Sequence, residues 1–155
     1  MEKQKLKISG EFVLEKRDKF GNVLQREVVK NTIVNTGLQR AAELLCGDST
    51  TGFDYIAIGS GVSGDAVLVT DTALETEITR EQADDSGSRY EADYKAVFEH
   101  IFVFYSAEAY TVREVGVFDG AVILGSVMLD RIVCNDISVD ASNDLYVKVT
   151  ITFSV

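Results

Sequence analysis

Proline and tryptophan are absent from this sequence, and its 155 residues include only two cysteines and one histidine. Without proline there is no rigid linker, and no proline protects the edge strands of a sheet. Such edges must then be charged, covered or paired with another copy. The cysteines, Cys46 and Cys134, lack the C-x-x-C spacing and companion histidines of a zinc site. We expect two reduced, partly buried thiols, with a disulfide between them as the alternative.

The single histidine, His100, lies between Glu99 and Ile101 in a predicted strand. General acid–base catalysis needs a positioned partner, and metal binding usually needs several ligands. Any catalytic triad would have to use this one side chain, and the sequence contains no G-x-S-x-G nucleophile elbow. We therefore expect a surface or interface histidine, and predict no enzyme activity, no catalytic residue, no metal site and no cofactor.

Charge of one sign predominates, with 25 acidic against 15 basic side chains and a net charge of −10. Nucleic-acid binding requires clustered Lys and Arg, and we interpret the most basic stretch, at residues 3–19, as a solvated strand face. Residues 1–10 lack the apolar region of a signal peptide, and no apolar run approaches the roughly 20 residues of a membrane span. The sequence predicts a soluble protein made in the cytoplasm, which neither binds nucleic acid nor inserts into a membrane.

Apolar and polar residues alternate along much of the chain, which is typical of half-buried β-strands. Residues 6–14 and 23–34, joined by a turn at 18–22, predict a long hairpin. Further strands are predicted at 53–58, 90–105, 110–118, 121–132 and 145–155, with 59–72 as a loop and 73–80 ambiguous. Asp119-Gly120 predicts a two-residue hairpin turn between two of these strands.

One helix is predicted at residues 37–46, because Leu38, Leu44 and Leu45 recur at helical spacing. Asn35 or Thr36 can cap its start, and a glycine at 47 can end it in the left-handed conformation. Its apolar face should lie against the sheet. The sequence thus predicts one domain, residues 1–155, that is mainly β: an antiparallel β-sandwich or barrel with one α-helix packed against it.

Residues 59–64 match the G-x-G-x-x-G pattern of dinucleotide sites, where glycines let a helix N-terminus approach a pyrophosphate. The following residues do not form an amphipathic helix, so we interpret the segment as a loop. Acidic residues gather in three loops, but none has the spacing of a calcium-binding loop. These residues are Asp65, Asp71, Glu75 and Glu77, then Asp84 and Asp85, then Asp136, Asp140 and Asp144. We interpret them as solvated loop charges, with adventitious calcium or magnesium or a glycosidase pair (Asp71 and Glu77) as alternatives.

Glu114 is unusual because it lies inside an otherwise apolar predicted strand, directly before the run from Val115 to Phe118. A buried carboxylate without a partner would be costly. Two interpretations stay open: an exposed strand position, or a structural ion pair with Arg80, Arg113 or Arg131.

Five segments follow one another in an order that recurs in other proteins. They are VKNTIVNTG at 29–37 leading into the predicted helix, YIAIGSG at 55–61, DTALETEITR at 71–80, VREVGVF at 112–118 and GSVMLDR at 125–131. Together they resemble a family of tailed-bacteriophage virion structural proteins, and the resemblance covers nearly the whole chain from about Leu6 onward.

The resemblance implies a structural role in the tail, baseplate, neck or fibre-attachment apparatus, located in a virion assembled in the host cytoplasm. It supplies no catalytic residue. We expect self-assembly, as a trimer or hexamer, and docking to other virion structural proteins. The alternatives are a capsid-decorating protein or a receptor- or carbohydrate-binding module, for which exposed aromatic side chains would provide the platform.

Overall fold

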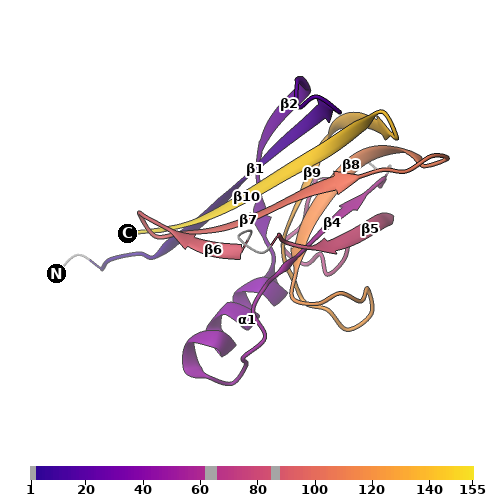
Figure 1. Cartoon of the computed structure of the whole chain (residues 1–155). Coiled ribbons are helices and arrows are strands. Elements are labelled where there is room, and N and C mark those ends of the chain that lie inside the picture. The colour runs from indigo at the N-terminus through magenta and orange to yellow at the C-terminus, as the bar shows by residue number, and fades with distance from the viewer. Residues whose placement is uncertain (1–2, 62–65, 85–87) are drawn as a thin grey trace.

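The computed structural model describes residues 3–61, 66–84 and 88–155 (Figure 1). Within these ranges the chain forms ten strands and one helix. They are β1 (Lys7–Asp18), β2 (Val23–Lys30), β3 (Thr32–Ile33), α1 (Asn35–Cys46), β4 (Tyr55–Gly59), β5 (Glu77–Gln82), β6 (Ser88–Glu91), β7 (Lys95–Val103), β8 (Ala109–Phe118), β9 (Met128–Asp140) and β10 (Asn143–Ser154).

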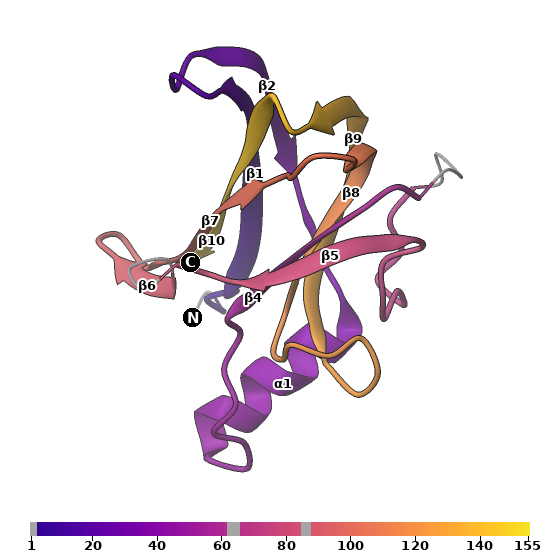
Figure 2. The ribbon, with the colours of Figure 1, turned by 45° about the vertical axis from the view of Figure 1, so that its right-hand side comes forward.

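The strands form two five-stranded antiparallel sheets that pack face to face (Figure 2). The first sheet has the order β2-β1-β10-β7-β6, and the second has the order β3-β9-β8-β4-β5. The chain changes sheets at Asn31, between β2 and β3, where its backbone N–H donates to the Gly10 carbonyl at 3.1 Å. This confirms the predicted fold class, a β-sandwich with one helix.

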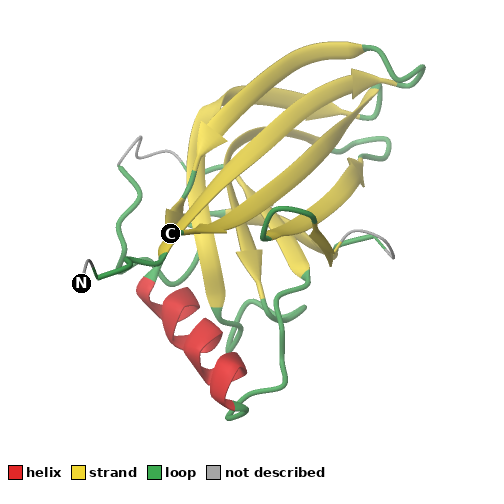
Figure 3. Cartoon of the chain, turned by 90° about the vertical axis from the view of Figure 1, so that its left-hand side faces the viewer, coloured by secondary structure: helices red, strands yellow, loops and turns green. Residues whose placement is uncertain are grey.

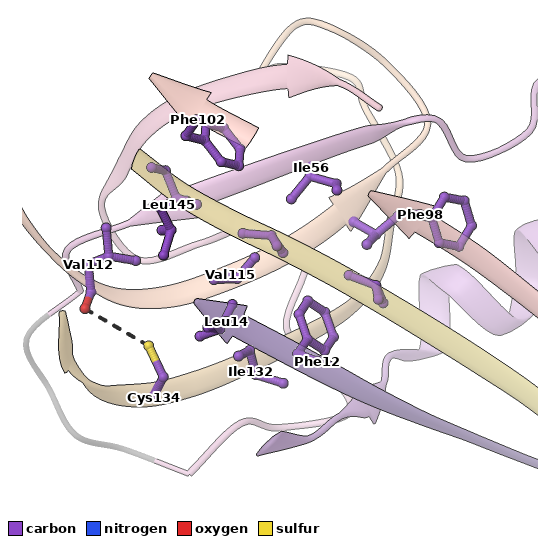
Figure 4. Close-up of a cluster of buried hydrophobic side chains, with 14 of the residues drawn as sticks. Phe12, Leu14, Ile56, Phe98, Phe102, Val112, Val115, Ile132, Cys134 and Leu145 are labelled. Carbon is purple, nitrogen blue, oxygen red and sulfur yellow. Dashed lines mark hydrogen bonds between the residues drawn. The ribbon is translucent and has the colours of Figure 1, made fainter. Parts of the chain in front are cut away.

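The core lies between the sheets and follows from period-two alternation, which sends every second side chain inward. Along β10 the four residues Leu145, Val147, Val149 and Ile151 are all buried, and the intervening residues are not. Phe12 and Leu14 of β1 lie beside them, facing Ile56, Val115 and Ile132 of the second sheet (Figure 4).

The predicted strand at residues 90–105 is confirmed over β7 but wrong in its first part, because the structure turns the chain between β6 and β7 into a hairpin. Asp93 and Tyr94 adopt positive φ values of 63° and 62° at the turn. Two successive positive φ values match the right-handed twist of the strands that they join. Glycine usually occupies such positions, so no turn signal is visible in the residues at this point.

The predicted strand at 121–132 is also wrong in its first half, because residues 119–127 form a loop and β9 begins only at Met128. Asp119 closes this loop: its backbone N–H donates to the Val127 carbonyl at 3.1 Å, and its carboxylate accepts from the Val127 N–H at 2.6 Å. Arg80 donates to two carbonyls inside the loop, those of Gly120 and Val122. These bonds give partners to part of the loop's backbone, where no strand pairing is formed.

Helix α1 begins two residues before the predicted start and lies across one end of the sandwich (Figure 3). Val34 occupies the N-cap position, so neither predicted cap residue acts there. Thr36 instead donates through Oγ1 to the Met128 carbonyl at 3.2 Å. Gly47 ends the helix with φ of 82°, as predicted. Only Gly37 of the helix is buried, so its apolar face is only partly covered.

Candidate functional site

A carboxylate lies inside the second sheet, at a position whose environment the sequence left open. Glu114 of β8 sits opposite Gly59 of β4 and Val133 of β9, and only 1% of its surface is exposed. An ionised carboxylate tolerates removal from water only when other groups satisfy its lone pairs. The surroundings of this side chain therefore decide whether it serves structure or chemistry.

Five N–H groups converge on the Glu114 carboxylate. The backbone N–H groups of Gly61, Glu75 and Thr76 donate at 3.0, 2.9 and 2.8 Å. Arg131 of β9 donates twice, through Nε at 3.1 Å and Nη2 at 2.7 Å. A carboxylate accepts about four hydrogen bonds, so this one is saturated. The structural ion pair is the correct interpretation, with Arg131 as its partner.

The two glycines at 59 and 61 explain the glycine-rich pattern before β5. A Cβ atom on Gly59 would lie 2.6 Å from Glu114 Oε1, and one on Gly61 would lie 2.7 Å from the same atom. The missing side chains thus let the backbone approach an anion, as in phosphate-binding loops. Here that anion belongs to the protein itself. The rest of the pattern, residues 62–64, lies outside the described residues.

Arg131 extends this cluster to the loop before β5. Its Nη1 donates to Asp71 Oδ2 at 2.8 Å, and the same oxygen accepts from the Leu68 N–H at 3.0 Å. Burial lowers the pKa of Arg131, but the hydrogen bonds and charges of Asp71 and Glu114 outweigh it and raise the pKa above its ordinary value. We call these residues, with the amides of 61, 75 and 76, the Glu114 cluster.

The other two candidate arginines have different partners. Arg80 pairs with Glu77 at 2.8 Å and stacks on the Phe118 ring at 3.7 Å from its centroid. Arg113 pairs with Asp136 at 2.9 Å, and this hydrogen bond lowers the pKa of the Asp136 carboxyl. These interactions hold β5 and the middle of β9 in place, and they leave Arg131 as the partner of Glu114.

A second buried carboxyl, Asp130, was missed by sequence reasoning. It is fully buried, and its Oδ2 accepts a short hydrogen bond from Asn31 Nδ2. Asn31 Oδ1 and Asp130 Oδ1 are both buried without a hydrogen-bond partner among the described residues. Burial raises the pKa of Asp130 to about 7. Alternation could not have revealed this residue, because its neighbours Leu129 and Arg131 are buried as well and β9 is covered on both faces here.

His100 does not join the Glu114 cluster. It is half-buried on β7, its Nδ1 lies 3.0 Å from Asp84 Oδ1, and its ring meets Phe102 edge-on at 4.7 Å. A cleft of about 410 Å³ between β5 and β7 includes His100, Glu81 and Glu108 in its lining. The Glu108 carboxylate accepts from the Tyr105 N–H at 2.6 Å, which ties it to the backbone.

The remaining acidic residues stay in separate loops. Asp140 accepts from Ser142, and Asp144 pairs with Lys19 at 2.5 Å. Asp65 and Asp85 lie outside the described residues. Across the described ranges, no group of three or more His, Cys, Asp or Glu side chains is placed to hold a metal ion.

Both cysteines are free thiols, so the alternative of a disulfide between them is wrong. Cys134 is buried in β9, but Cys46 is exposed at the end of α1, so the predicted partial burial of Cys46 is wrong. Burial raises the pKa of the Cys134 thiol to about 12, which keeps it protonated, and Sγ lies 3.9 Å from the Val112 carbonyl oxygen (Figure 4).

The chain matches no protein-family model, no curated protein and no solved structure. None of the helices that the structure describes is long and apolar enough to cross a membrane.

Proposed function

We propose that this protein is a structural subunit of a tailed-phage virion, in the tail, baseplate, neck or fibre-attachment apparatus. It acts by self-assembly and by docking to other virion proteins, without catalysis. The observation that carries the proposal is where the five family-like segments lie in three dimensions.

Four of the five segments meet at Leu129 to Arg131 of β9, and the second joins them through Gly61, which donates to Glu114. In the first segment, the Asn31 side chain donates a hydrogen bond to Asp130. Gly37 of the same segment packs so tightly that a Cβ atom on it would lie 2.7 Å from the Leu129 Cα. The second and third segments supply Gly61 and Asp71, the fourth supplies Glu114, and the fifth contains β9 residues 128–131 themselves. The residues behind the resemblance therefore build the scaffold.

The chemistry of the Glu114 cluster supports a structural role. Arg131 directs Nε and Nη2 at Glu114 and Nη1 at Asp71, and the glutamate already accepts five hydrogen bonds. A catalytic carboxylate must exchange a proton or reach a substrate. A saturated, buried one instead fixes the position of the loop that it holds.

Association surfaces are available at the sheet edges. The strands β2 and β6 end the first sheet, and β3 and β5 end the second. Edges of this kind can accept a strand or loop from another chain. Large apolar side chains are also exposed, among them Leu124 and Leu45, each 90% exposed.

Particle composition tests the proposal. Mass spectrometry of purified particles of the encoding phage should detect this protein at a fixed ratio to the major capsid protein. Deleting its coding sequence should give particles that lack a complete tail apparatus, and expression in trans should restore them. A protein absent from washed particles, or a deletion that leaves particle structure and infectivity unchanged, would contradict the proposal.

The cleft between β5 and β7 favours a second candidate, a carbohydrate-binding role within the virion. Tyr105 lines it with 71% of its surface exposed, and Tyr110 and Phe104 lie behind with ring centroids 6.1 Å apart. Exposed aromatic rings beside carboxylates suit sugar stacking. A glycan array should show hits that Tyr105→Ala removes and Tyr90→Ala, outside this cleft, retains. An array without hits would exclude this candidate.

A further inference from the structure

The cleft of about 410 Å³ between β5 and β7 lies between two strand edges, one from each sheet. On one side β7 pairs with β10 along its whole length, but on the other side its pairing with β6 ends at Phe98. Strand β5 ends the second sheet and pairs with β4 alone. No strand in the described part of the chain joins these two edges.

Backbone groups of β7 point into this cleft. The Glu99 carbonyl accepts from the Asp84 N–H at 3.0 Å, which closes the cleft at one end. Every second residue of a strand directs its N–H and C=O groups to the same side, so the backbone groups of Ile101 and Val103 face the cleft as those of Glu99 do. Past this end, no backbone hydrogen bond joins β5 to β7 within residues 66–84 and 88–155. An extended segment can add to such an edge by β-augmentation.

The side chains in the cleft carry uncompensated negative charge. Glu81 lies opposite Ile56, a core residue, so the Glu81 side chain points to the inner side of the sheet, where it stays exposed because β5 is an edge strand. Glu81 and Glu108 line the cleft, and its lining contains no Lys or Arg. Neither carboxylate forms an ion pair with a described residue. This arrangement favours a cationic occupant.

The segment before β1, residues 3–6, has the complementary character, and we call it the N-terminal arm. All of its residues are exposed, and none belongs to a helix or strand. Lys3 and Lys5 form no ion pair with any residue that the structure describes, and Leu6 is 65% exposed. In an extended chain Lys3 and Lys5 share one side and Leu6 lies on the other. The arm can therefore present a cationic side and an apolar side as a short strand.

An N-terminal arm does not reach the cleft of its own molecule. Lys7, where β1 begins, pairs with Ser154 at the end of the first sheet that holds Lys95 (Figure 1). Ile101 lies about 20 Å further along β7, and β10 separates β1 from β7. Residues 3–6 span at most about 14 Å when fully extended. An arm that enters a cleft therefore comes from another copy.

We propose that the N-terminal arm of one copy enters the cleft between β5 and β7 of the next copy and adds to the free edge of β7. Its lysines face the two carboxylates on the inner side of the cleft. On the outer side, Leu6 contacts Ile101 and Val103, which are 41% and 48% exposed. The contact is heterologous, because different surfaces of the two copies meet.

This inference deepens the proposed function and rests on it, since it names the contact by which copies of the subunit assemble. It also competes with the second candidate function, because a cleft that holds the arm has no room for a sugar. The experiments below therefore decide between the two occupants of the cleft.

Charge reversal tests each half of the contact. Lys5→Glu alters the arm and Glu81→Lys alters the cleft. The matched controls are Lys30→Glu and Glu11→Lys, since both residues are exposed on the outer face of the first sheet. Light scattering over a concentration series should give the same association for the wild type and both controls. Each reversal in the contact should weaken association at least about tenfold.

The double variant separates the contact from a general effect of charge. A chain with both Lys5→Glu and Glu81→Lys should regain most of the wild-type association, because the attraction returns with its sign exchanged. Circular dichroism should show every variant folded, since all four substituted positions are exposed. Association unchanged by either single reversal, or a double variant no better than the single ones, would overturn the contact.

Cross-linking of the wild-type protein locates the contact. A carbodiimide joins a lysine amine to a carboxylate that it touches, with loss of water. Digestion and mass spectrometry should find Lys3 or Lys5 joined to Glu81 or Glu108. Isotope-labelled and unlabelled protein, combined in dilute solution and then concentrated, should give cross-links between the two kinds of chain. Cross-links confined to single chains, or arm lysines joined only to other carboxylates, would overturn the contact.

The failure of this contact and the failure of the proposed function give different results. A wild type that is monomeric at every concentration, yet is a component of purified particles, would overturn the contact and leave the virion role standing. A monomeric wild type that is absent from particles would overturn both. A monomeric wild type with glycan hits that Tyr105→Ala removes would overturn the contact in favour of the sugar.

Discussion

The fully buried Asp130 should make this protein more stable in mild acid than in mild base. Among the described residues no cation pairs with its carboxyl, and its Oδ2 accepts from Asn31 Nδ2. When Asp130 is protonated, its Oδ1–H can donate to Asn31 Oδ1, which satisfies the two oxygens that are otherwise unpartnered. The pair then resembles a cyclic acid–amide dimer with no net charge.

The sign and size of this change in stability with pH follow from the pKa of Asp130. Burial raises the pKa of Asp130 from its ordinary value of 3.8 to about 7 in the folded protein. Between these values the folded state binds more protons than the unfolded state, so the free energy of unfolding falls as pH rises and levels off above pH 7. Each pH unit over which the folded state holds one extra proton changes that free energy by about 1.36 kcal/mol. From pH 5 to pH 8 the expected loss is therefore about 2–3 kcal/mol.

Urea unfolding of wild type and Asp130→Asn, followed by circular dichroism at pH 5 and pH 8, measures this loss. An amide at 130 can exchange both hydrogen bonds with Asn31 without a charge, so the variant should lack the Asp130 part of the pH dependence. All other groups titrate alike in the two proteins, so the difference isolates Asp130. At pH 8 the variant should be the more stable by about 2 kcal/mol.

Two results would refute this reasoning. One is equal pH dependence in wild type and variant, which would mean that Asp130 is ionised throughout. The other is a variant much less stable than the wild type at pH 8, which would mean that the carboxylate form is favoured there. Acidic residues with lowered pKa, such as Asp18 and Asp136, lose stabilisation only as pH falls below their ordinary value of 3.8, outside this range.

Three further outcomes are expected from the Glu114 cluster and α1. Glu114→Ala should lower the free energy of unfolding by about 3–5 kcal/mol, because it leaves Arg131 buried beside Asp71 alone, and urea unfolding checks this against exposed Glu11→Ala. Gly61→Ala should cost about 1–3 kcal/mol through the 2.7 Å clash with Glu114, whereas Gly52→Ala, with open space around it, should be neutral. Gly47→Ala should cost about 1 kcal/mol, because φ of 82° strains any side chain, and thermal unfolding measures it.

The local sequence pattern was enough to predict several elements of the fold. The alternation in β1 and β10, the turn between β1 and β2, and the helix with its end at Gly47 all depend on residues within a few positions of each other. The mainly β class follows from their sum. In each case the chain's own periodicity or backbone preference dictates the structure, so neighbours far along the sequence were not needed.

The boundaries that failed depended on distant partners. The apolar run at 121–124 reads as a strand, but Arg80 holds its carbonyls and Asp119 closes the loop. The turn at Asp93 and Tyr94 uses positive φ without glycine, and its Tyr94 carbonyl accepts from the distant Phe153 N–H at 3.0 Å. Sequence near these residues does not contain the contacts that decide them.

By itself, then, the sequence determined a mainly β chain, one helix and a costly glutamate in an apolar strand. Only the tertiary structure decided that Arg131, and not Arg80 or Arg113, pairs with that glutamate, and that Asp130 faces Asn31. The physical reason is register: the pairing of β8 with β4 and β9 sets which side chains share a buried space. With the pairing of β3 and β9, residues separated by 17 to 99 positions then meet within hydrogen-bond distance.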